Sequence, residues 1–318
     1  MKHNTQAIFL IFLAVTAFDV AGAKGQGACD RACLEGIADQ YMSAMAAHDA
    51  GQAPFADDLI FTENTVRLPP TEGLWFTASD FTDYKFYITD AETSQVAWTG
   101  IVKEHDKPVL FSVRLKVVDR RITEAEQIVV RNLTERNLAN LKTPPPGLAD
   151  SLAEAERGTR EAMLTIPDLY FAALAKLDDS DVPFADRCYR IENGMVTAGT
   201  FAGAVKPETG LPGSSKCANG NIPPMLKTIH NVQPRRTPIV DVERGMTWGV
   251  YAFNHRGLGT ITMPDGSVRP SYAPTPNTMP CVEIFKTRNG KITDIFAIGS
   301  AMPYGIGDGW AGPLFQDF

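Results

Sequence analysis

Apolar and polar positions follow two different periods in the first half of the chain. Residues 29–50 carry apolar side chains every three or four positions, which predicts a helix. The Ala-Pro-Phe-Ala segment at residues 53–56 breaks that spacing. Residues 94–102 and 111–117 then alternate between apolar and polar, which predicts long antiparallel strands. A helical lead-in followed by a sheet is therefore expected.

The second half repeats this order. Residues 149–165 are rich in Ala, Glu and Leu and predict a helix, and a second helix is expected after Pro167 up to Leu177. Strands follow, with tight hairpin turns expected at residues 265–266 and 289–290. Asp-Gly and Asn-Gly, the dipeptides at these positions, favour turns with positive φ.

An internal repeat links the two halves directly. Residues 41–64 align without a gap with residues 170–193, and ten of the 24 aligned positions are identical. Two later matches extend the repeat: Trp98 with Trp248, and residues 122–124 with residues 292–294. The offset of 129 residues exceeds the roughly 20 to 50 residues of solenoid repeats, so the copied unit is a domain.

The N-terminus predicts export. Residues 1–23 combine Lys2, an apolar run and small residues at Ala21 and Ala23, which is the pattern of a secretory signal peptide. A periplasmic or extracellular location follows. The expected organisation is a first domain at 24–142, a Pro-rich linker at 143–147 and a second domain at 148–318.

Charge and apolar content narrow the expected partners. The net charge is −7 and the basic residues are scattered, which argues against a nucleic-acid partner. After the signal, no stretch approaches the roughly 20 apolar residues of a membrane helix. A hydrophobic small molecule is the expected partner, and homo-oligomerisation is left open.

Five cysteines follow the signal, and export makes disulfides possible. Cys188 begins a predicted strand and Cys217 lies in an insertion, so we predict that these two form a disulfide. The pairing of Cys29, Cys33 and Cys281 stays open. Cys29 and Cys33 lie four residues apart, but no second ligand pair follows, so no metal site is expected. No phosphate-binding glycine loop appears, and no cofactor is expected.

The second copy is the more elaborated one. It is 21 residues longer between Glu192 and Trp248 than the first copy is between Glu63 and Trp98. It is 20 residues longer again between Trp248 and Ile292. Insertions of this length usually cover or line a site, so function is expected in the second domain.

The order of elements, with Pro-Phe-Ala-Asp in each copy and Glu-Asn at 63–64 and 192–193, resembles the nuclear transport factor 2-like superfamily, also called SnoaL-like. More narrowly, the chain resembles a secreted family within that superfamily. The resemblance lies in the signal, the two copies, the segment 188–194 and the strand at 289–292. The resemblance implies an α+β fold of two tandem cone-shaped domains, each with helices packed on a curved antiparallel sheet. It also implies a pocket used without a cofactor, and a relation to lyases that release formaldehyde from lignin-derived aromatic dimers.

Glu63 and Glu192 occupy matching strand positions, and each has a structural and a functional interpretation. Either glutamate is a hydrogen-bonding residue beside a turn, or it is a carboxylate in an apolar site that exchanges protons near neutral pH. Arg190 lies on the strand face of Glu192, and the first copy has no counterpart to it. This difference favours chemistry in the second domain, with Arg190 stabilising an anion.

Two histidines of the second copy are candidate bases. His230 and His255 lie on or beside predicted strands, and alternation places Tyr251, Phe253 and His255 on one face. The alternative for both histidines is a core or rim position. Trp98 and Trp248 are expected to pack the sheets against the helices. The residues expected to line the ligand pocket are Trp248, Tyr251, Phe253, Tyr170 and Asn193.

The resulting hypothesis is a cofactor-independent lyase or isomerase for a hydrophobic, aromatic small molecule. Glu192, with His255 or His230, would transfer protons, and Arg190 would stabilise developing negative charge. The first alternative is a secreted binding protein for an apolar ligand, which needs aromatic residues but no convergent His, Glu and Arg. The second is a structural protein whose domains contain no cavity.

Overall fold

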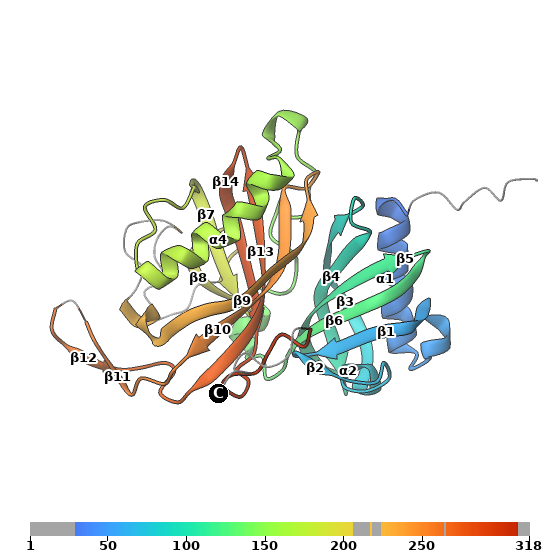
Figure 1. Ribbon diagram of the computed structural model, residues 1–318, viewed down its shortest axis with the longest axis horizontal. Helices are drawn as coiled ribbons and strands as arrows, with labels where there is room; N and C mark the ends of the chain where they lie inside the picture. The colour runs from blue at the N-terminus through green and yellow to red at the C-terminus, as the bar shows by residue number, and fades with distance from the viewer. Residues whose placement is uncertain (1–28, 206–216, 218–223, 264, 311–318) are drawn as a thin grey trace, which may run out of the picture.

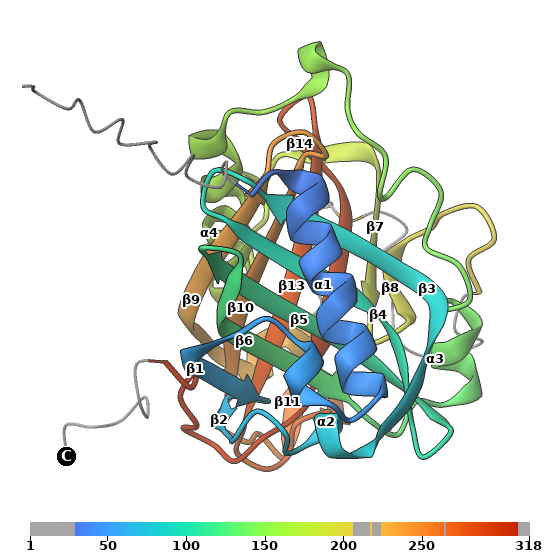
Figure 2. The same cartoon turned by 90° about the vertical axis from the view of Figure 1, so that its right-hand side faces the viewer.

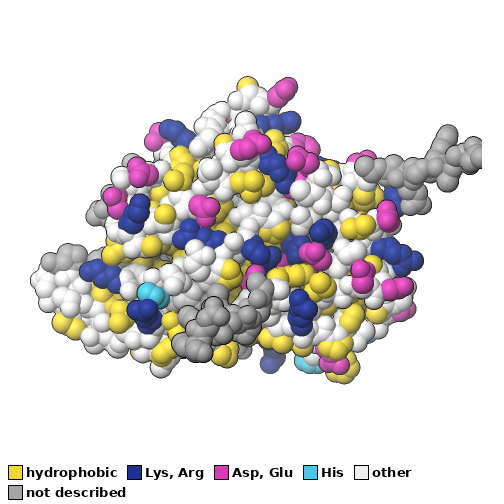
Figure 3. Space-filling view, in the orientation of Figure 1, with side chains coloured by type: hydrophobic (Ala, Val, Ile, Leu, Met, Phe, Trp, Pro, Cys, Tyr) yellow, Lys and Arg dark blue, Asp and Glu magenta, His cyan; other side chains and the backbone are white. Residues whose placement is uncertain are grey.

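The computed structural model describes residues 29–205, 217, 224–263 and 265–310 (Figure 1). The predicted signal peptide lies outside the described residues. Two six-stranded sheets lie face to face, and one long helix covers the outer face of each (Figures 1 and 2). Acidic and basic side chains are interspersed over the face shown in Figure 3. Within the described residues, no helix is long and apolar enough to cross a membrane.

The first domain is built on a sheet with the strand order β2-β1-β6-β5-β4-β3. Its elements are α1 (Arg31–Ala46), η1 (Ala50–Gln52), β1 (Phe55–Glu63), β2 (Val66–Arg67), α2 (Leu74–Thr77), β3 (Ala78–Asp90), β4 (Gln95–Glu104), β5 (Lys107–Val118), β6 (Arg121–Val130) and α3 (Glu135–Ala139). Asp30 starts α1 by accepting a hydrogen bond from the backbone N–H of Cys33. The apolar stripe of α1 packs on the sheet (Figure 2).

The second domain repeats this topology with the order β8-β7-β14-β13-β10-β9. Its elements are η2 (Glu154–Glu156), α4 (Arg160–Lys176), β7 (Phe184–Glu192), β8 (Met195–Gly199), η3 (Pro224–Thr228), β9 (Ile229–Asp241), β10 (Met246–His255), β11 (Thr260–Thr262), β12 (Val268–Pro270), β13 (Asn277–Arg288) and β14 (Lys291–Gly299). The additional β11–β12 hairpin extends from the end of the sheet (Figure 1). The internal repeat is thus confirmed at the level of strand order.

The helix prediction for the second copy is wrong in detail. Helix α4 starts at Arg160, after the capping residue Thr159, and it continues through Pro167 instead of ending there. Residues 149–159 contain only the short η2 turn. The Leu152 N–H donates to the Glu243 carbonyl, so this segment is tied to the neighbouring hairpin and not to a helix of its own.

The expected fold class, helices packed on a curved antiparallel sheet, is also wrong. The described part of the chain is mostly β, with 46% strand and 19% helix. Each sheet is mixed, because β1 pairs in parallel with β6 and β7 in parallel with β14. Alternation along a strand predicts one buried face, whereas every residue of β10 is buried. The second buried face packs against the other sheet through a shared apolar core.

The expected match of Trp98 with Trp248 is off by one residue. The β3–β4 turn joins Asp90 to Gln95 and the β9–β10 turn joins Asp241 to Met246, so structurally equivalent residues here differ by 151. Trp98 therefore corresponds to Gly249. Because a shift of one residue reverses the side-chain direction, Trp98 packs under α1 while Trp248 lies between the sheets, where its Nε1 donates to Ser112 Oγ at 2.9 Å.

Two equivalent aspartates connect the domains by a reciprocal exchange. Asp90 accepts a hydrogen bond from the Val240 N–H, and Asp241 accepts one from the Thr89 N–H, each at 3.0 Å. Each aspartate also pairs with the first arginine of the other domain's helix: Arg160 with Asp90 and Arg31 with Asp241, both at 2.7 Å. The two domains thus make the same contact twice, as the subunits of a symmetric dimer do.

We predict that Asp241→Ala lowers the free energy of unfolding by about 3 to 5 kcal/mol, because it leaves the Arg31 guanidinium without its buried partner. Glu243→Ala is the matched control. It removes another partner of Arg31. The Glu243 side chain is 44% exposed, so the change should lower the free energy of unfolding by at most about 1 kcal/mol. Chemical denaturation measures both, and equal losses would contradict the buried role of Asp241.

Candidate functional site

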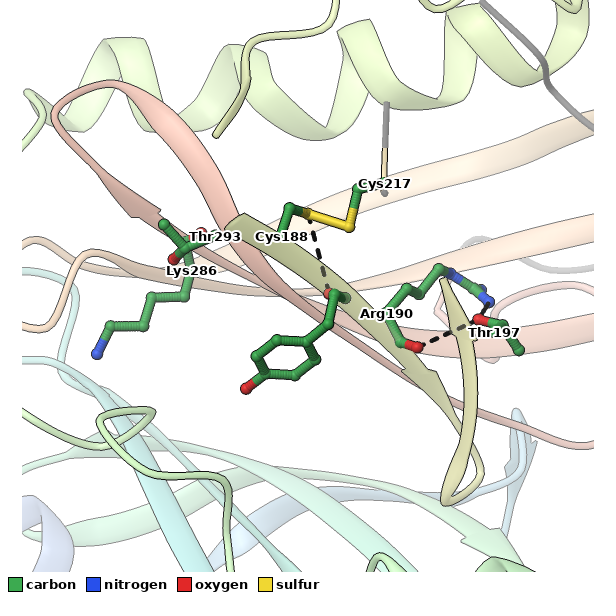
Figure 4. The surroundings of a disulfide bond; sticks show 7 residues. Cys188, Arg190, Thr197, Cys217, Lys286 and Thr293 are labelled. Carbon is green, nitrogen blue, oxygen red and sulfur yellow. Dashed lines mark hydrogen bonds between the residues drawn. A yellow bond between two sulfur atoms is a disulfide. The ribbon is translucent and has the colours of Figure 1, made fainter. Parts of the chain in front are cut away.

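A cluster of charged side chains lies on the helix-facing side of the second sheet. Arg190 Nη1 donates to Glu192 Oε2 at 2.6 Å, and Arg190 Nη2 donates to Glu283 Oε1 at 2.7 Å. Arg190 also donates to Thr197 of β8 (Figure 4). The Glu283 side chain is fully buried, whereas the Glu192 side chain is 30% exposed. The cluster therefore extends from the interior of the domain toward solvent.

Strand register brings these residues together. Glu192 of β7 pairs with Ala297 of β14, Ala297 pairs with Glu283 of β13, and Glu283 pairs with Gly249 of β10. The four residues therefore form one row across the sheet and share a face. Arg190 precedes Glu192 by two residues and points to the same side.

The equivalent row of the first domain has different side chains. There Glu63, Gln127, Val113 and Trp98 pair in the same order across the strands. The second domain thus places Glu283 where the first has a valine. On either side of this carboxylate the second domain has Ala297 and Gly249, where the first domain has the larger Gln127 and Trp98.

Arg190 is likewise specific to the second domain, because its equivalent in the first is Phe61. Phe61 and Val113 are both buried in the core under α1. The same position of the same fold is therefore stably filled by an apolar pair. Since a buried ion pair is often no more stabilising than apolar residues of similar volume, stability does not explain Arg190 and Glu283.

The two glutamates of the repeat have different contacts. In the first domain, Glu63 Oε2 accepts from the Leu74 N–H at 2.6 Å and Oε1 lies 3.2 Å from Arg131 Nη2. Trp75, next to Leu74, packs edge-on against Tyr41 and fills this side of the sheet. Glu63 is therefore a structural residue that caps α2, whereas Glu192 is bound to the Arg190 of the cluster.

Burial controls the protonation of Glu283. It raises the pKa of this carboxyl from 4.5 to about 7, although Arg190 opposes the shift. Burial also disfavours the charged guanidinium of Arg190, but the nearby Tyr170, Glu192 and Glu283 raise its pKa, so it stays protonated. Glu283 Oε2 has no hydrogen-bond partner within the described residues. A carboxyl group that exchanges protons near neutral pH is thus in place.

Tyr170 faces this cluster from α4. Its counterpart Tyr41 donates to Gln127 Oε1 at 2.9 Å, but the residue equivalent to Gln127 is Ala297. No hydrogen bond from the Tyr170 hydroxyl to a described residue replaces it. Burial raises the pKa of Tyr170, Arg190 opposes this shift and Glu283 adds to it, so the hydroxyl stays protonated and can donate a hydrogen bond beside the cluster.

His255 lies at the end of β10 on the same side of the sheet. Its Nε2 is 3.2 Å from the hydroxyl of Tyr272, a residue of the second insertion. Burial lowers the pKa of His255, while Asn277 and the charge of Glu192 partly offset this effect. The imidazole is therefore neutral at pH 7 and able to accept a proton.

Aromatic rings line the remainder of this side. Phe171 packs against Tyr251 with ring centroids 4.3 Å apart, and it contacts Phe253 and Phe285 edge-on. Tyr170 also lies edge-on to Phe285. The predicted lining residues Tyr170, Tyr251 and Phe253 thus share one buried aromatic group with α4.

Three predicted site residues lie elsewhere. Trp248 is between the two sheets, for the register reason given above. His230 is exposed at the start of β9, and no bond joins it to the described part of the cluster. Asn193 has a positive φ and exchanges two hydrogen bonds with Gly299, as Asn64 does with Val129, so it holds a turn.

The predicted disulfide is present. Cys188 and Cys217 are joined with a Cα–Cα distance of 5.4 Å, which attaches the first insertion to β7 (Figure 4). Cys29 and Cys33 form a second disulfide, and Cys281 is a buried free thiol whose pKa burial raises. Among the described residues, no group of three or more His, Cys, Asp or Glu side chains is arranged to hold a metal ion.

Glu283 and Tyr272 are the site residues that the sequence analysis missed. Glu283 carries a readable signal, because it stands between Cys281 and Phe285 on the inward-facing positions of an apolar strand. Tyr272 carries none, since it lies in an insertion without period. Tyr272 reaches His255 only because the chain after the β11–β12 hairpin folds back toward the end of β10.

Comparison with known families gives one match. A model described as a domain of unknown function (DUF8021) matches residues 156–299. The match spans α4 and all strands of the second sheet, so the chain is similar to this family over the domain that carries the cluster. A search of curated proteins finds no match.

We predict a pH dependence of stability that Glu283 causes. Its pKa of about 7 in the folded state exceeds its ordinary 4.5, so it contributes stability below pH 4.5 that is lost as pH rises through 7. The difference corresponds to roughly 3 kcal/mol. In Glu283→Gln this loss should be absent, which thermal unfolding between pH 4 and pH 8 measures. An unchanged pH profile in the variant would contradict the shifted pKa.

Proposed function

We propose that the second domain is an acid–base catalyst, a cofactor-independent lyase or isomerase that acts on a hydrophobic, aromatic small molecule. One observation carries the proposal. Arg190 and Glu283, which form the cluster together with Glu192, replace the apolar Phe61 and Val113 of the first domain, and the cluster lies beside a neutral histidine and a group of aromatic rings.

The proposed chemistry needs only proton transfers by residues of the cluster. Glu192, partly exposed and paired with Arg190, or the neutral His255 removes a proton from the substrate. Glu283 holds a proton near pH 7 and donates it to the oxygen on which negative charge develops. Arg190 stabilises that charge, which matters most where water is excluded.

The aromatic side chains support the substrate class. The rings of Tyr170, Phe171 and Phe253 pack edge-on against one another beside the cluster, and an apolar, planar molecule is the ligand that such rings suit. Lignin-type aromatic dimers, which lose formaldehyde in a carbon–carbon cleavage, are the first compounds to test. Export to the periplasm or the extracellular space is part of the proposal, and two disulfides are compatible with it.

A plain binding protein is the weaker alternative. It needs the aromatic group, but no carboxyl with a raised pKa beside a neutral histidine. The structural interpretation suits the first domain, where Trp75 and Trp98 fill the space under α1. Catalysis is therefore assigned to the second domain, with the first as its support.

We predict that Glu283→Gln and Glu192→Gln each lower turnover by roughly 10²- to 10⁴-fold, because each removes a positioned acid or base. Glu63→Gln, the same change at the matching position of the first domain, should leave turnover within a few-fold. The assay incubates the protein with aromatic dimers without added cofactor and follows formaldehyde or stilbene absorbance.

Circular dichroism and thermal unfolding establish that each variant is folded. Inactivation by Glu63→Gln, with full activity in the two second-domain variants, would place the chemistry in the first domain and overturn the assignment.

A further inference from the structure

The two insertions of the second domain meet at Tyr272. This tyrosine follows β12 in the second insertion, and its hydroxyl hydrogen bonds with Thr228, which ends the first insertion. The same hydroxyl lies 3.2 Å from His255 Nε2, and the two rings are edge-on with centroids 5.6 Å apart. One phenol thus joins both insertions to the candidate base.

Burial raises the pKa of Tyr272, so the phenol keeps its proton and can donate it in a hydrogen bond to His255 Nε2, which lies 3.2 Å away. A chain of hydrogen bonds runs from Thr228 through Tyr272 to the imidazole.

Within the described part of the chain, the Tyr272 hydroxyl is the partner whose distance to the ring is 3.2 Å. Asn277 and the backbone of Phe253 are near enough to raise the pKa of His255, but Nδ1 has no partner at bonding distance among the described residues. Nδ1 is buried, and a neutral imidazole whose Nε2 accepts a hydrogen bond carries its proton on Nδ1.

The first domain shows that this arrangement is not required by the fold. Strand pairing places Glu104 opposite Lys107 as it places His255 opposite Asn277, so Glu104 is the counterpart of His255. Glu104 binds Arg131 at 2.7 Å and Thr77 at 2.6 Å. At this position the first domain has the Glu104–Arg131 ion pair and no insertion.

We propose that Tyr272 is a positioning residue, whose hydroxyl donates to His255 Nε2 and thereby holds the imidazole in the tautomer protonated on Nδ1. The catalytic consequence rests on the proposed function, but the tautomer does not. Tyr272 thereby gives the second insertion a defined role in the site.

The test is ¹⁵N NMR of the imidazole rings in the intact protein, with His255 assigned by its loss in His255→Asn. We expect the wild type to show protonated Nδ1 and unprotonated Nε2, and Tyr272→Phe to lose this single tautomer. Tyr87→Phe, which removes a hydrogen-bonded hydroxyl in the first domain, should leave the His255 signals unchanged. Protonated Nε2 in the wild type, or the same tautomer in Tyr272→Phe, would overturn the inference.

Kinetics separate this inference from the proposed function. With an active substrate, Tyr272→Phe should lower kcat on the order of 10- to 100-fold through misplacement of the base. Full turnover in Glu283→Gln would end the proposed catalysis and leave the NMR result standing. An unchanged tautomer with inactive Glu283→Gln would end only the role of Tyr272.

Discussion

The reciprocal contact of Asp90 and Asp241 is the constraint on which the architecture depends. Each carboxylate reaches into the other domain, accepts a backbone hydrogen bond there and pairs with the arginine that begins the other helix. This contact holds the two sheets face to face. As a result, one face of every central strand is committed to the partner domain, and the opposite face lies under a helix.

This division leaves only the helix-facing side of each sheet for chemistry, and the two domains use it differently. The first fills it with Trp75 and Trp98 and caps a helix with Glu63. The second keeps Gly249 and Ala297 in the equivalent row and places Glu283 between them. A duplicated fold thus pairs an apolar copy, whose core needs no buried charge at these positions, with a copy that carries one.

The sequence predicted the parts of this arrangement that depend on local period and direct alignment. Spacing or alignment along the chain was enough to predict four features. These are the repeat, the strands β4 and β5, the Cys188–Cys217 disulfide, and the shared face of Arg190 and Glu192. The fold class did not follow, because strands buried on both faces have no alternation that reveals the second sheet. Trp248 was assigned to the wrong face, since one extra residue in copy two reverses side-chain direction.

The meeting of Glu283 with Arg190 could not be derived because it depends on the pairing of β7, β14 and β13, which are far apart in sequence. Alternation along β13 carries a signal for Glu283, a carboxylate on the inward-facing positions of an apolar strand, but Glu283 was not predicted as a site residue. Only the register shows that Val113 is its counterpart, and therefore that the charge is dispensable for folding. That comparison between copies, more than any single contact, supports a functional role for the cluster.

The most direct measurement is the free energy of unfolding of a variant that carries the apolar residues of the first domain in the second. Arg190→Phe with Glu283→Val introduces the equivalents of Phe61 and Val113, and Glu192→Gln removes the charge that Arg190 would leave unpaired. If the cluster is retained for function, this triple variant should be at least as stable as the wild type. A loss of about 3 to 5 kcal/mol, as for breaking a buried pair, would show that the cluster holds the fold together and would contradict the account.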